Sequence, residues 1–553
     1  MTTLARNDIE ENFKFVVLEV KKQVEDTLKA IEAPSISITD RIRERDDYID
    51  NLKSVIENKS FSRIFNISIS DQKEIDFLRA LLTITSNLEK IGDYSVNIGG
   101  QLRYLKIRDF IKKYDYRSFY DELFTALNLI VKAFYKQDVK LALRICRVEL
   151  TIDAIYKRNL NKILGEMNTQ SNSEDLITTL FIFQYLERMG DALLNIGEAI
   201  IFSVMGEKIK IREYKALENS LANTGLAGEP INELNYNGIW GTRSGCKIGS
   251  VNNNGSKQSK LHVFFKHGKL KKLKEEKVNI ELWEKRFPGL APKVFAFQKD
   301  RDSAALLLEY LNGHNLQEII VNSEKKLFKK AFSSFLATTS HVWNETISQK
   351  KVNAKFIQQI ANRIDDVYRF HPQLKNRANR IGGLQIPSLE ELLERAAPIE
   401  TEIDAPFSIF IHGDFNTNNI IYSPTDNKTH YIDLHRSRQG DFAQDVSVFM
   451  VSNFRLPVFG PEARDRLNKV MKDFFYFSLA FAKENDDPTF QARLALGLVR
   501  SFITSVQYEY RPEFAKVMFL RGIYILGKIL AYHEEADKNS WENFNLSEEY
   551  FIY

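Results

Sequence analysis

The stretch IHGDFNTNNIIY, residues 411–422, places one His, one Asp and three Asn between two apolar runs. A second short apolar run, YIDLH at residues 431–435, follows and contains Asp433. Strand-forming residues dominate both runs, so we predict the two strands of a hairpin. The polar side chains then lie where buried strands turn, which is typical of a catalytic loop and decides the fold of the C-terminal half.

The polar residues of this stretch suit phosphoryl transfer. That reaction needs an acid beside the attacking hydroxyl and oxygen ligands for the cation that neutralises the phosphates. Asp414 suits the first task, because a carboxylate can orient a hydroxyl and accept its proton. Asn419 and Asp433 suit the second, because they present oxygens to Mg²⁺ from adjacent loop ends. We expect His412 to pack and form hydrogen bonds rather than to transfer protons.

An upstream strand and helix add a candidate for binding phosphate. The run KLHVFFKHG, residues 260–268, alternates like a strand and contains Lys266. The acidic run KLKEEKVNIELWEKRF, residues 272–287, reads as a helix. A strand Lys that is oriented by a helix acid is the usual apparatus for the α- and β-phosphates of ATP. The partner of Lys266 is either Glu276 or Glu281, and the sequence leaves both open.

Three motifs in this half, HGDFNTNN, YIDLH and GDFAQD, resemble those of the aminoglycoside phosphotransferase and choline kinase family, whose fold is that of the protein kinases. The resemblance implies an α+β bilobal domain, with a small lobe at residues 239–312 and a large lobe at 313–553. It implies ATP and Mg²⁺ as cofactors. The implied roles are catalytic base for Asp414, magnesium ligands for Asn419 and Asp433, ATP phosphate binding for Lys266, and bracing of the catalytic loop for Asp445.

Two positions depart from that family. Asn416 stands where the family often has His, and Phe442 stands where Pro usually follows Gly-Asp. Neither change removes a predicted ligand, but both argue against assigning an antibiotic as the phosphate acceptor.

The N-terminal part contains an internal repeat. Its apolar spacing is helical from residue 13 to about 212, and LEKIGDYSVNIG at residues 88–99 recurs as LERMGDALLNIG at 186–197, an offset of 98 residues. We therefore predict an all-α domain over residues 1–212, built of two tandem three-helix units at about 8–110 and 117–212.

Acidic residues recur at the same places in both units. Carboxylates at i and i+4 share one helix face and repel each other unless a cation lies between them. Two facing helices with such pairs would form an oxygen-ligand cluster for Mg, Ca, Mn or iron, whereas any single pair is more simply a solvated face. The candidate ligands are Asp46, Asp50, Glu89 and Asp93 in the first unit, and Glu149, Asp153, Glu187 and Asp191 in the second.

Two tandem three-helix units that each carry Glu-x-x-Gly-Asp-x-x-x-Asn resemble PhoU, a regulator associated with phosphate transport. The resemblance covers about residues 8–212. It implies a further metal ion on the acidic faces, either iron, Mn, Mg or Zn, with Asn97 and Asn195 supporting the ligands. It also implies a role in phosphate signalling, with a phosphate transporter or sensor protein as partner.

Composition limits the remaining possibilities. The net charge is only +4 with both signs interspersed, which does not indicate a nucleic-acid binder. Cys146 and Cys246 match no ligand spacing and fit a reducing compartment. We found no signal peptide and no apolar run long enough to span a bilayer, and we predict a cytoplasmic location. A stretch rich in Gly, Asn and Pro at residues 213–238 predicts the linker between the halves.

Together these patterns predict an ATP-dependent phosphotransferase that acts on a hydroxyl of a small molecule and is fused to a regulatory helical domain linked to phosphate homeostasis. Two alternatives stay open. The acceptor can be a protein Ser or Thr, or the second half can be a pseudokinase adaptor that binds nucleotide without turnover. The sequence leaves the acceptor, the oligomeric state and any control of one half by the other undetermined.

Overall fold

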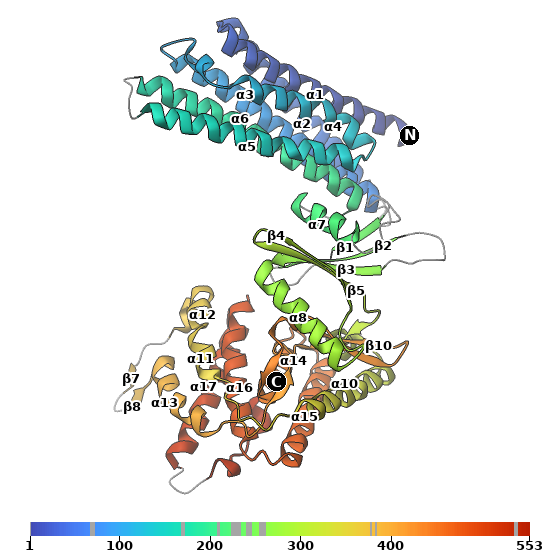
Figure 1. The fold of residues 1–553 in the computed structure, drawn as a ribbon, viewed down its shortest axis with the longest axis vertical. Helices are drawn as coiled ribbons and strands as arrows, with labels where there is room; N and C mark the ends of the chain where they lie inside the picture. Colours follow the sequence, from blue (N-terminus) through green and yellow to red (C-terminus); the bar gives the residue numbers. More distant parts are fainter. Residues whose placement is uncertain are drawn as a thin grey trace. The chain divides into compact units, whose positions relative to one another are not determined.

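The chain forms two compact units, residues 1–267 and 268–553, each described by itself below. The computed structural model describes residues 2–66, 72–167, 172–206, 211–222, 234–238, 246–253, 262–375, 379–381, 384–535 and 540–553 (Figure 1).

Long helices make up most of the first unit, as Figure 1 shows. Within each predicted three-helix unit the second helix packs against the third, and the two third helices pack against each other. The predicted pair of tandem three-helix units is therefore confirmed. The helices are α1 (Thr2–Glu32), α2 (Ile36–Asn66), α3 (Gln72–Gln101), α4 (Arg117–Tyr135), α5 (Val139–Met167) and α6 (Ser173–Met205).

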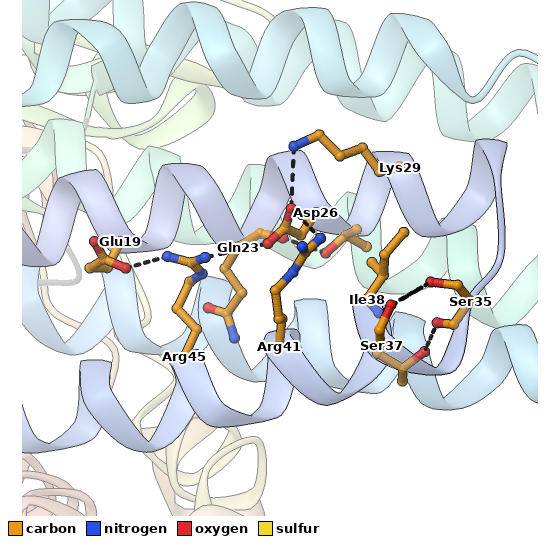
Figure 2. A network of polar contacts seen from close by, with 11 residues as sticks. Glu19, Gln23, Asp26, Lys29, Ser35, Ser37, Ile38, Arg41 and Arg45 are labelled. Carbon is orange, nitrogen blue, oxygen red and sulfur yellow. Dashed lines mark hydrogen bonds and ion pairs between the residues drawn. The ribbon is translucent and has the colours of Figure 1, made fainter.

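A polar network sets how α1 lies against α2 (Figure 2). Asp26 of α1 is only 5% exposed and therefore needs partners for its charge. Arg41 and Arg45 of α2 supply them, each with an Nη2 atom 3.4 Å from an Asp26 carboxylate oxygen. Arg45 also forms an ion pair with Glu19 of α1. Gln23 of α1 donates a hydrogen bond to the carbonyl oxygen of Ile42 on α2 at 2.9 Å.

The rest of the first unit contains helix α7 (Ile211–Ala222) and strands β1 (Leu234–Gly238), β2 (Lys247–Asn253) and β3 (His262–Lys269), the last of which runs across the boundary between the units. β1 pairs with β2, and β2 with β3, both antiparallel. The predicted linker thus begins in a helix, because the apolar positions of α7 are buried. Residues 223–233 of that linker, and 239–245 and 254–261 of the predicted small lobe, lie outside the described residues. The domain boundaries themselves stay a prediction.

The second unit combines helices with short antiparallel sheets, which agrees with the predicted kinase-like α+β fold. β4 pairs with β5, β10 lies between β11 and β6, and β12 pairs with β9. Among the described residues, no helix of either unit combines the length and apolar character needed to cross a membrane. The strands are β4 (Val294–Asp300), β5 (Ser303–Glu309), β6 (His314–Asn315), β7 (Asn379–Ile381), β8 (Leu384–Ile386), β9 (Ile409–Ile411), β10 (Ile420–Ser423), β11 (Lys428–Tyr431) and β12 (Arg438–Gly440).

Ten helices of four or more residues surround these strands in the described part of the second unit. They are α8 (Leu270–Arg286), α9 (Leu316–Asn322), α10 (Lys325–Thr346), α11 (Phe356–Ala361), α12 (Ile364–Phe370), α13 (Leu389–Glu402), α14 (Phe442–Phe454), α15 (Pro461–Glu484), α16 (Phe490–Ser505) and α17 (Pro512–Glu535).

A buried ion network fixes the beginning of α14. The Asp441 side chain accepts a hydrogen bond from the backbone amide of Ala443 at 3.0 Å and so caps the helix. The guanidinium of Arg493, on α16, donates to Asp441 at 2.8 Å and to Asp487 at 2.6 Å. All three charged side chains are nearly inaccessible to solvent, so each depends on the others. The network ties α14, which carries Asp445, to α16.

Aromatic side chains form the core next to the catalytic stretch. Phe449 of α14 stacks on Phe335 of α10, with ring centroids 5.0 Å apart and planes 7° apart. Phe449 also packs on Phe474 at 4.3 Å, and Phe415 of the catalytic stretch lies 5.7 Å from Phe335. Burial of these rings anchors the residue that directly follows Asp414.

Truncation of Phe449 tests this core. We expect Phe449→Ala to destabilise the second unit by about 3–5 kcal/mol, because the lost ring leaves a cavity among rigid neighbours. Denaturant unfolding of the full chain measures the effect. The control Phe370→Ala removes a ring that is 65% exposed and is expected to change stability by less than about 0.5 kcal/mol. Equal effects of both substitutions would contradict the assignment of this core.

Candidate active site

Asp445 holds the catalytic loop by its backbone. One carboxylate oxygen accepts a hydrogen bond from the His412 amide at 2.7 Å, and the other accepts one from the Gly413 amide at 2.9 Å. Burial raises the pKa of Asp445 to about 7, while the same two amides lower it by favouring the charged form. The carboxylate therefore accepts the hydrogen bonds of two successive buried amides, which would otherwise need water as a partner.

Gly413 is required by the geometry of this turn. Its φ is +81°, in the region that residues with a Cβ rarely adopt. A Cβ built on Gly413 would lie 2.4 Å from the carbonyl oxygen of Arg436. The His-Gly-Asp sequence thus reflects a close approach of two backbones, and this approach brings residues 412–414 beside the turn that follows Asp433.

His412 joins the two halves of the site. The backbone amide of Asp414 donates to its Nδ1 at 3.3 Å, which leaves Nε2 to donate to the carbonyl oxygen of Ile432 at 3.0 Å. Because Nδ1 accepts a hydrogen bond it carries no proton, so the ring is neutral, and burial, which lowers the pKa of His412, favours the same form. A neutral ring with both nitrogens engaged positions its neighbours and has no free nitrogen for proton transfer.

Each carboxylate oxygen of Asp414 has a polar partner. Its Oδ1 accepts a hydrogen bond from Asn416 Nδ2 at 2.6 Å, and its Oδ2 lies 3.4 Å from Arg436 Nη1. Asn416, which departs from the family pattern, thus contacts the predicted base directly. The prediction from sequence missed Arg436, although its place three residues after Asp433 offered a signal.

Asn419 and Asp433 lie on turns that a backbone hydrogen bond joins. The amide of Ile432 donates to the Asn419 carbonyl oxygen at 3.0 Å. The side-chain Nδ2 of Asn419 donates to the backbone oxygen of Asp414 at 2.9 Å, so its Oδ1 is the end left for a ligand. Asp433 adopts a left-handed conformation with φ +61°, and His435 Nδ1 lies 3.3 Å from its Oδ1. Amide and carboxylate oxygens are a donor set that fits Mg²⁺.

The predicted phosphate lysine and its two candidate partners lie on β3 and α8. Lys266 is 3% exposed and belongs to the first unit, whereas both glutamates belong to the second. Glu276 is 1% exposed, while Glu281 pairs with Lys277 at 3.0 Å on the helix surface. Of the two glutamates, Glu276 is the one whose burial suits a fixed internal partner. Its pairing with Lys266 stays a prediction.

In the first three-helix unit, the four predicted acids face one another. Asp46 and Asp50 lie on α2, and Glu89 and Asp93 lie on α3. Burial, followed by repulsion from Glu89, Asp46 and Asp50, raises the pKa of Asp93 to about 6. Lys53 supplies a counter-charge, with its Nζ 3.0 Å from Glu89.

The second three-helix unit repeats the arrangement with different partners. Burial raises the pKa of Glu187, and repulsion from Asp191, Asp153 and Glu149 adds to it. Gln184 donates to the Glu187 carboxylate at 2.8 Å, and Lys157 pairs with Asp153 at 2.6 Å. Asn195, one of the two predicted supporting residues, donates to Asn87 at 3.4 Å. The supporting role of Asn97 stays a prediction.

The shared glycines of the repeat serve helix packing. A Cβ on Gly92 would lie 2.9 Å from Gln23 Oε1 and 3.1 Å from Asp46 Oδ1. A Cβ on Gly190 would lie 3.0 Å from Ile152. Close approach of α2 to α3 and of α5 to α6 therefore explains these glycines without any metal.

The predicted further metal ion in the helical domain gains no support. In the part of the chain that the structure describes, no group of three or more His, Cys, Asp or Glu side chains is placed to hold a metal ion. Lys53 and Lys157 pair with Glu89 and Asp153, one acid of each group, and so supply part of the positive charge that a cation would otherwise bring.

Two family models match separate parts of the chain. Residues 17–102 and 117–200 match the PhoU domain, and residues 270–459 match the Ecdysteroid kinase-like family. The N-terminal half thus contains a PhoU domain and the C-terminal half is kinase-like, which confirms both resemblances seen in the sequence. The kinase-like match includes Asp414, Asn419 and Asp433 and begins just after Lys266.

Similar proteins cover the two halves separately. A phosphate-specific transport system accessory protein PhoU homolog from Clostridium acetobutylicum is 25% identical over 35% of this chain and 89% of its own length. Its homolog 1 from Thermotoga maritima is 27% identical over 38% and 89%. Among solved structures, Plasmodium vivax ethanolamine kinase is 14% identical, covers 60% of this chain and 88% of its own, and has a TM-score of 0.34.

Replacement of Asp445 tests the support of the loop. We expect Asp445→Asn to destabilise the second unit by about 1–3 kcal/mol, because Asn accepts at one oxygen and its NH₂ faces the other amide. Denaturant unfolding measures the loss. Asp465→Asn, at an exposed position of α15, is the matched control and is expected to be neutral. A neutral Asp445→Asn would refute the bracing role.

The acids of the first three-helix unit predict a dependence on pH. Folded Asp93 keeps its proton up to pH about 6, whereas the ordinary value is 3.8, so its contribution favours folding at low pH and is lost as pH rises between these values. We therefore expect Asp93→Asn to raise the melting temperature at pH 7.5 in EDTA, and by less at pH 5. Calorimetry of the full chain measures both, with Asp121→Asn as the surface control. A lower melting temperature at pH 7.5 would show that ionised Asp93 stabilises the fold.

Proposed function

We propose that the second unit is an ATP-dependent phosphotransferase that transfers the γ-phosphate to a hydroxyl of a small molecule. The observation that carries the proposal is the joint placement of Asp414, Asn419 and Asp433 on two turns held together by His412 and by the bond from Ile432 to Asn419. The match to a family described as ecdysteroid kinase-like supports a small-molecule acceptor over a protein one.

The chain's own residues divide the chemistry as follows. The carboxylate of Asp414 orients the acceptor hydroxyl and takes its proton as the oxygen attacks the γ-phosphorus. Asn419 and Asp433 would hold Mg²⁺, which when bound neutralises charge on the phosphate oxygens. Arg436, already beside Asp414, is placed to stabilise negative charge on the transferring group. The role of Lys266 as a ligand of the ATP phosphates, with Glu276 or Glu281 as its orienting acid, stays a prediction from the sequence.

We also propose that the PhoU domain regulates this activity according to phosphate status. The relatives named as accessory proteins of phosphate-specific transport support this role, and a phosphate transporter or sensor is the proposed partner. A cytoplasmic location fits an enzyme that draws on ATP.

Substitution of the base tests the catalytic proposal. We expect Asp414→Asn to lower kcat for ADP formation with an acceptor by roughly 10²–10⁴-fold, because the proton acceptor is lost. ATP binding in the presence of Mg²⁺, measured by calorimetry, should change little. Asp426→Asn, in the exposed turn between β10 and β11, is the control and should keep full activity. Nucleotide binding without any turnover that depends on Asp414 would favour a pseudokinase adaptor instead.

A further inference from the structure

Three arginines from separate elements interact electrostatically with Asp414. Arg436 follows β11 and contacts the Asp414 carboxylate. Arg363 lies at the start of α12, and Arg500 lies on α16, against which both α11 and α12 pack. Arg363 and Arg500 act electrostatically on each other, and both act on Arg436 and on Asp414. The three arginines, each more than sixty positions from the next in the sequence, thus interact with one another and with a single carboxylate.

The three guanidiniums are only partly opposed by acids. Within the described residues, the ion pair that they form is the one between Arg436 and Asp414, while Tyr508, Asp414 and Asp366 favour the charge of Arg363. Asp445 is near Arg500, but its oxygens accept the amides of His412 and Gly413. Burial, followed by repulsion from Arg363 and Arg436, lowers the pKa of Arg500 to about 9. An anion would relieve this repulsion.

Arg500 and Arg363 differ in how they are held. Arg500 is 6% exposed and is aimed by two neutral partners, because its Nε donates to Gln359 Oε1 at 2.8 Å and its Nη1 to Ser501 Oγ at 3.2 Å. Arg363 is half-buried, and Tyr508, Asp414 and Asp366 favour its charge. Burial and repulsion from Arg436 nevertheless lower its pKa. A guanidinium is a planar fork that matches a carboxylate or a phosphate.

We propose that Arg363 and Arg500 bind an anionic group of the phosphate acceptor, so that the substrate is an alcohol that carries a phosphate or carboxylate. The inference rests on the proposed phosphotransferase function and specifies its substrate class. Arg436 serves the transferring phosphoryl group, while the two helix arginines hold the acceptor with its hydroxyl at Asp414. In the reaction the acceptor oxygen bonds to the γ-phosphorus, the bond from the γ-phosphorus to the bridging oxygen breaks, ADP leaves, and the hydroxyl proton passes to Asp414 and then to solvent.

An acceptor panel tests the substrate class with the full-length chain. ADP release is measured with matched probes: glycerol, glycerol 3-phosphate, glycerate and ethanolamine, then glucose, glucose 6-phosphate and gluconate. We expect an anionic member to have the highest kcat/KM in its set. A preference for the neutral or cationic members would overturn the inference, as would anionic members that neither react nor bind in the presence of ADP and Mg²⁺.

Variants of Arg363 test the assignment to this site. We expect Arg363→Gln to raise the KM of the anionic acceptor by about 10–100-fold, the loss of a charge-assisted bond, with the KM of ATP within about twofold. Arg363→Lys should recover part of the loss. Arg369→Gln, on the same helix and paired with Asp366, is the matched control and should change neither constant.

The outcomes distinguish a failure of the acceptor site from a failure of the proposed phosphotransferase function. An unchanged acceptor KM in Arg363→Gln, or an increase confined to the KM of ATP, overturns the acceptor site but leaves a phosphotransferase. If neutral acceptors are turned over and Asp414→Asn abolishes this turnover, the acceptor site is likewise overturned and the phosphotransferase function stands. The absence of any turnover that depends on Asp414 overturns the proposed function, and the inference with it.

Discussion

The carboxylate of Asp445 is the constraint on which the candidate active site depends. It accepts the amides of His412 and Gly413, and so fixes the backbone from which Asp414 projects. The helix that carries Asp445 is in turn held at its first turn by Asp441 and Arg493. A buried charge-assisted network is costly to break, so the helices transmit a defined position to the loop. Precision at Asp414 comes from charges that never contact a substrate.

In the helical unit the acidic residues recur in both three-helix units, but the side chains that pair with them differ. Lys53 pairs with Glu89 in the first three-helix unit, whereas the equivalent position of the second is Tyr156, which donates to Gln184 at 2.7 Å. Gln184 then bonds Glu187. The two acidic faces are therefore not electrostatically equivalent, although their motifs are. The repeated spacing of the carboxylates accompanies the same helix packing in both units, and does not by itself define a metal site.

The sequence predicted features that lie within one or two adjacent elements, and it missed residues that distant parts of the chain bring together. Helical periodicity and the repeated acidic motif predicted the three-helix units. HGD with Asn419 and Asp433 predicted two polar turns that the structure joins by a hydrogen bond, because each lies within one or two adjacent elements. Arg363 and Arg500 escaped notice, since no local pattern distinguishes them from solvated arginines and their elements meet only where α12 packs on α16. The reason for the glycines of the repeat also lies between elements, because Asp46 and Ile152 of the neighbouring helices take the space that a Cβ would need.

The charge balance around Asp414 bears on both nucleotide binding and acceptor binding in the proposed site. A base that faces a triphosphate experiences repulsion from it, and a carboxylate alone there would disfavour nucleotide binding. Arg436 offsets that repulsion at 3.4 Å, and Asn416 holds the other carboxylate oxygen without adding charge. In the proposed site, Arg436 serves this balance, and Arg363 and Arg500 are left to hold an anionic group of the acceptor. Because desolvated like charges destabilise a fold unless something opposes them, the mutual repulsion of these arginines is the physical argument for that proposal.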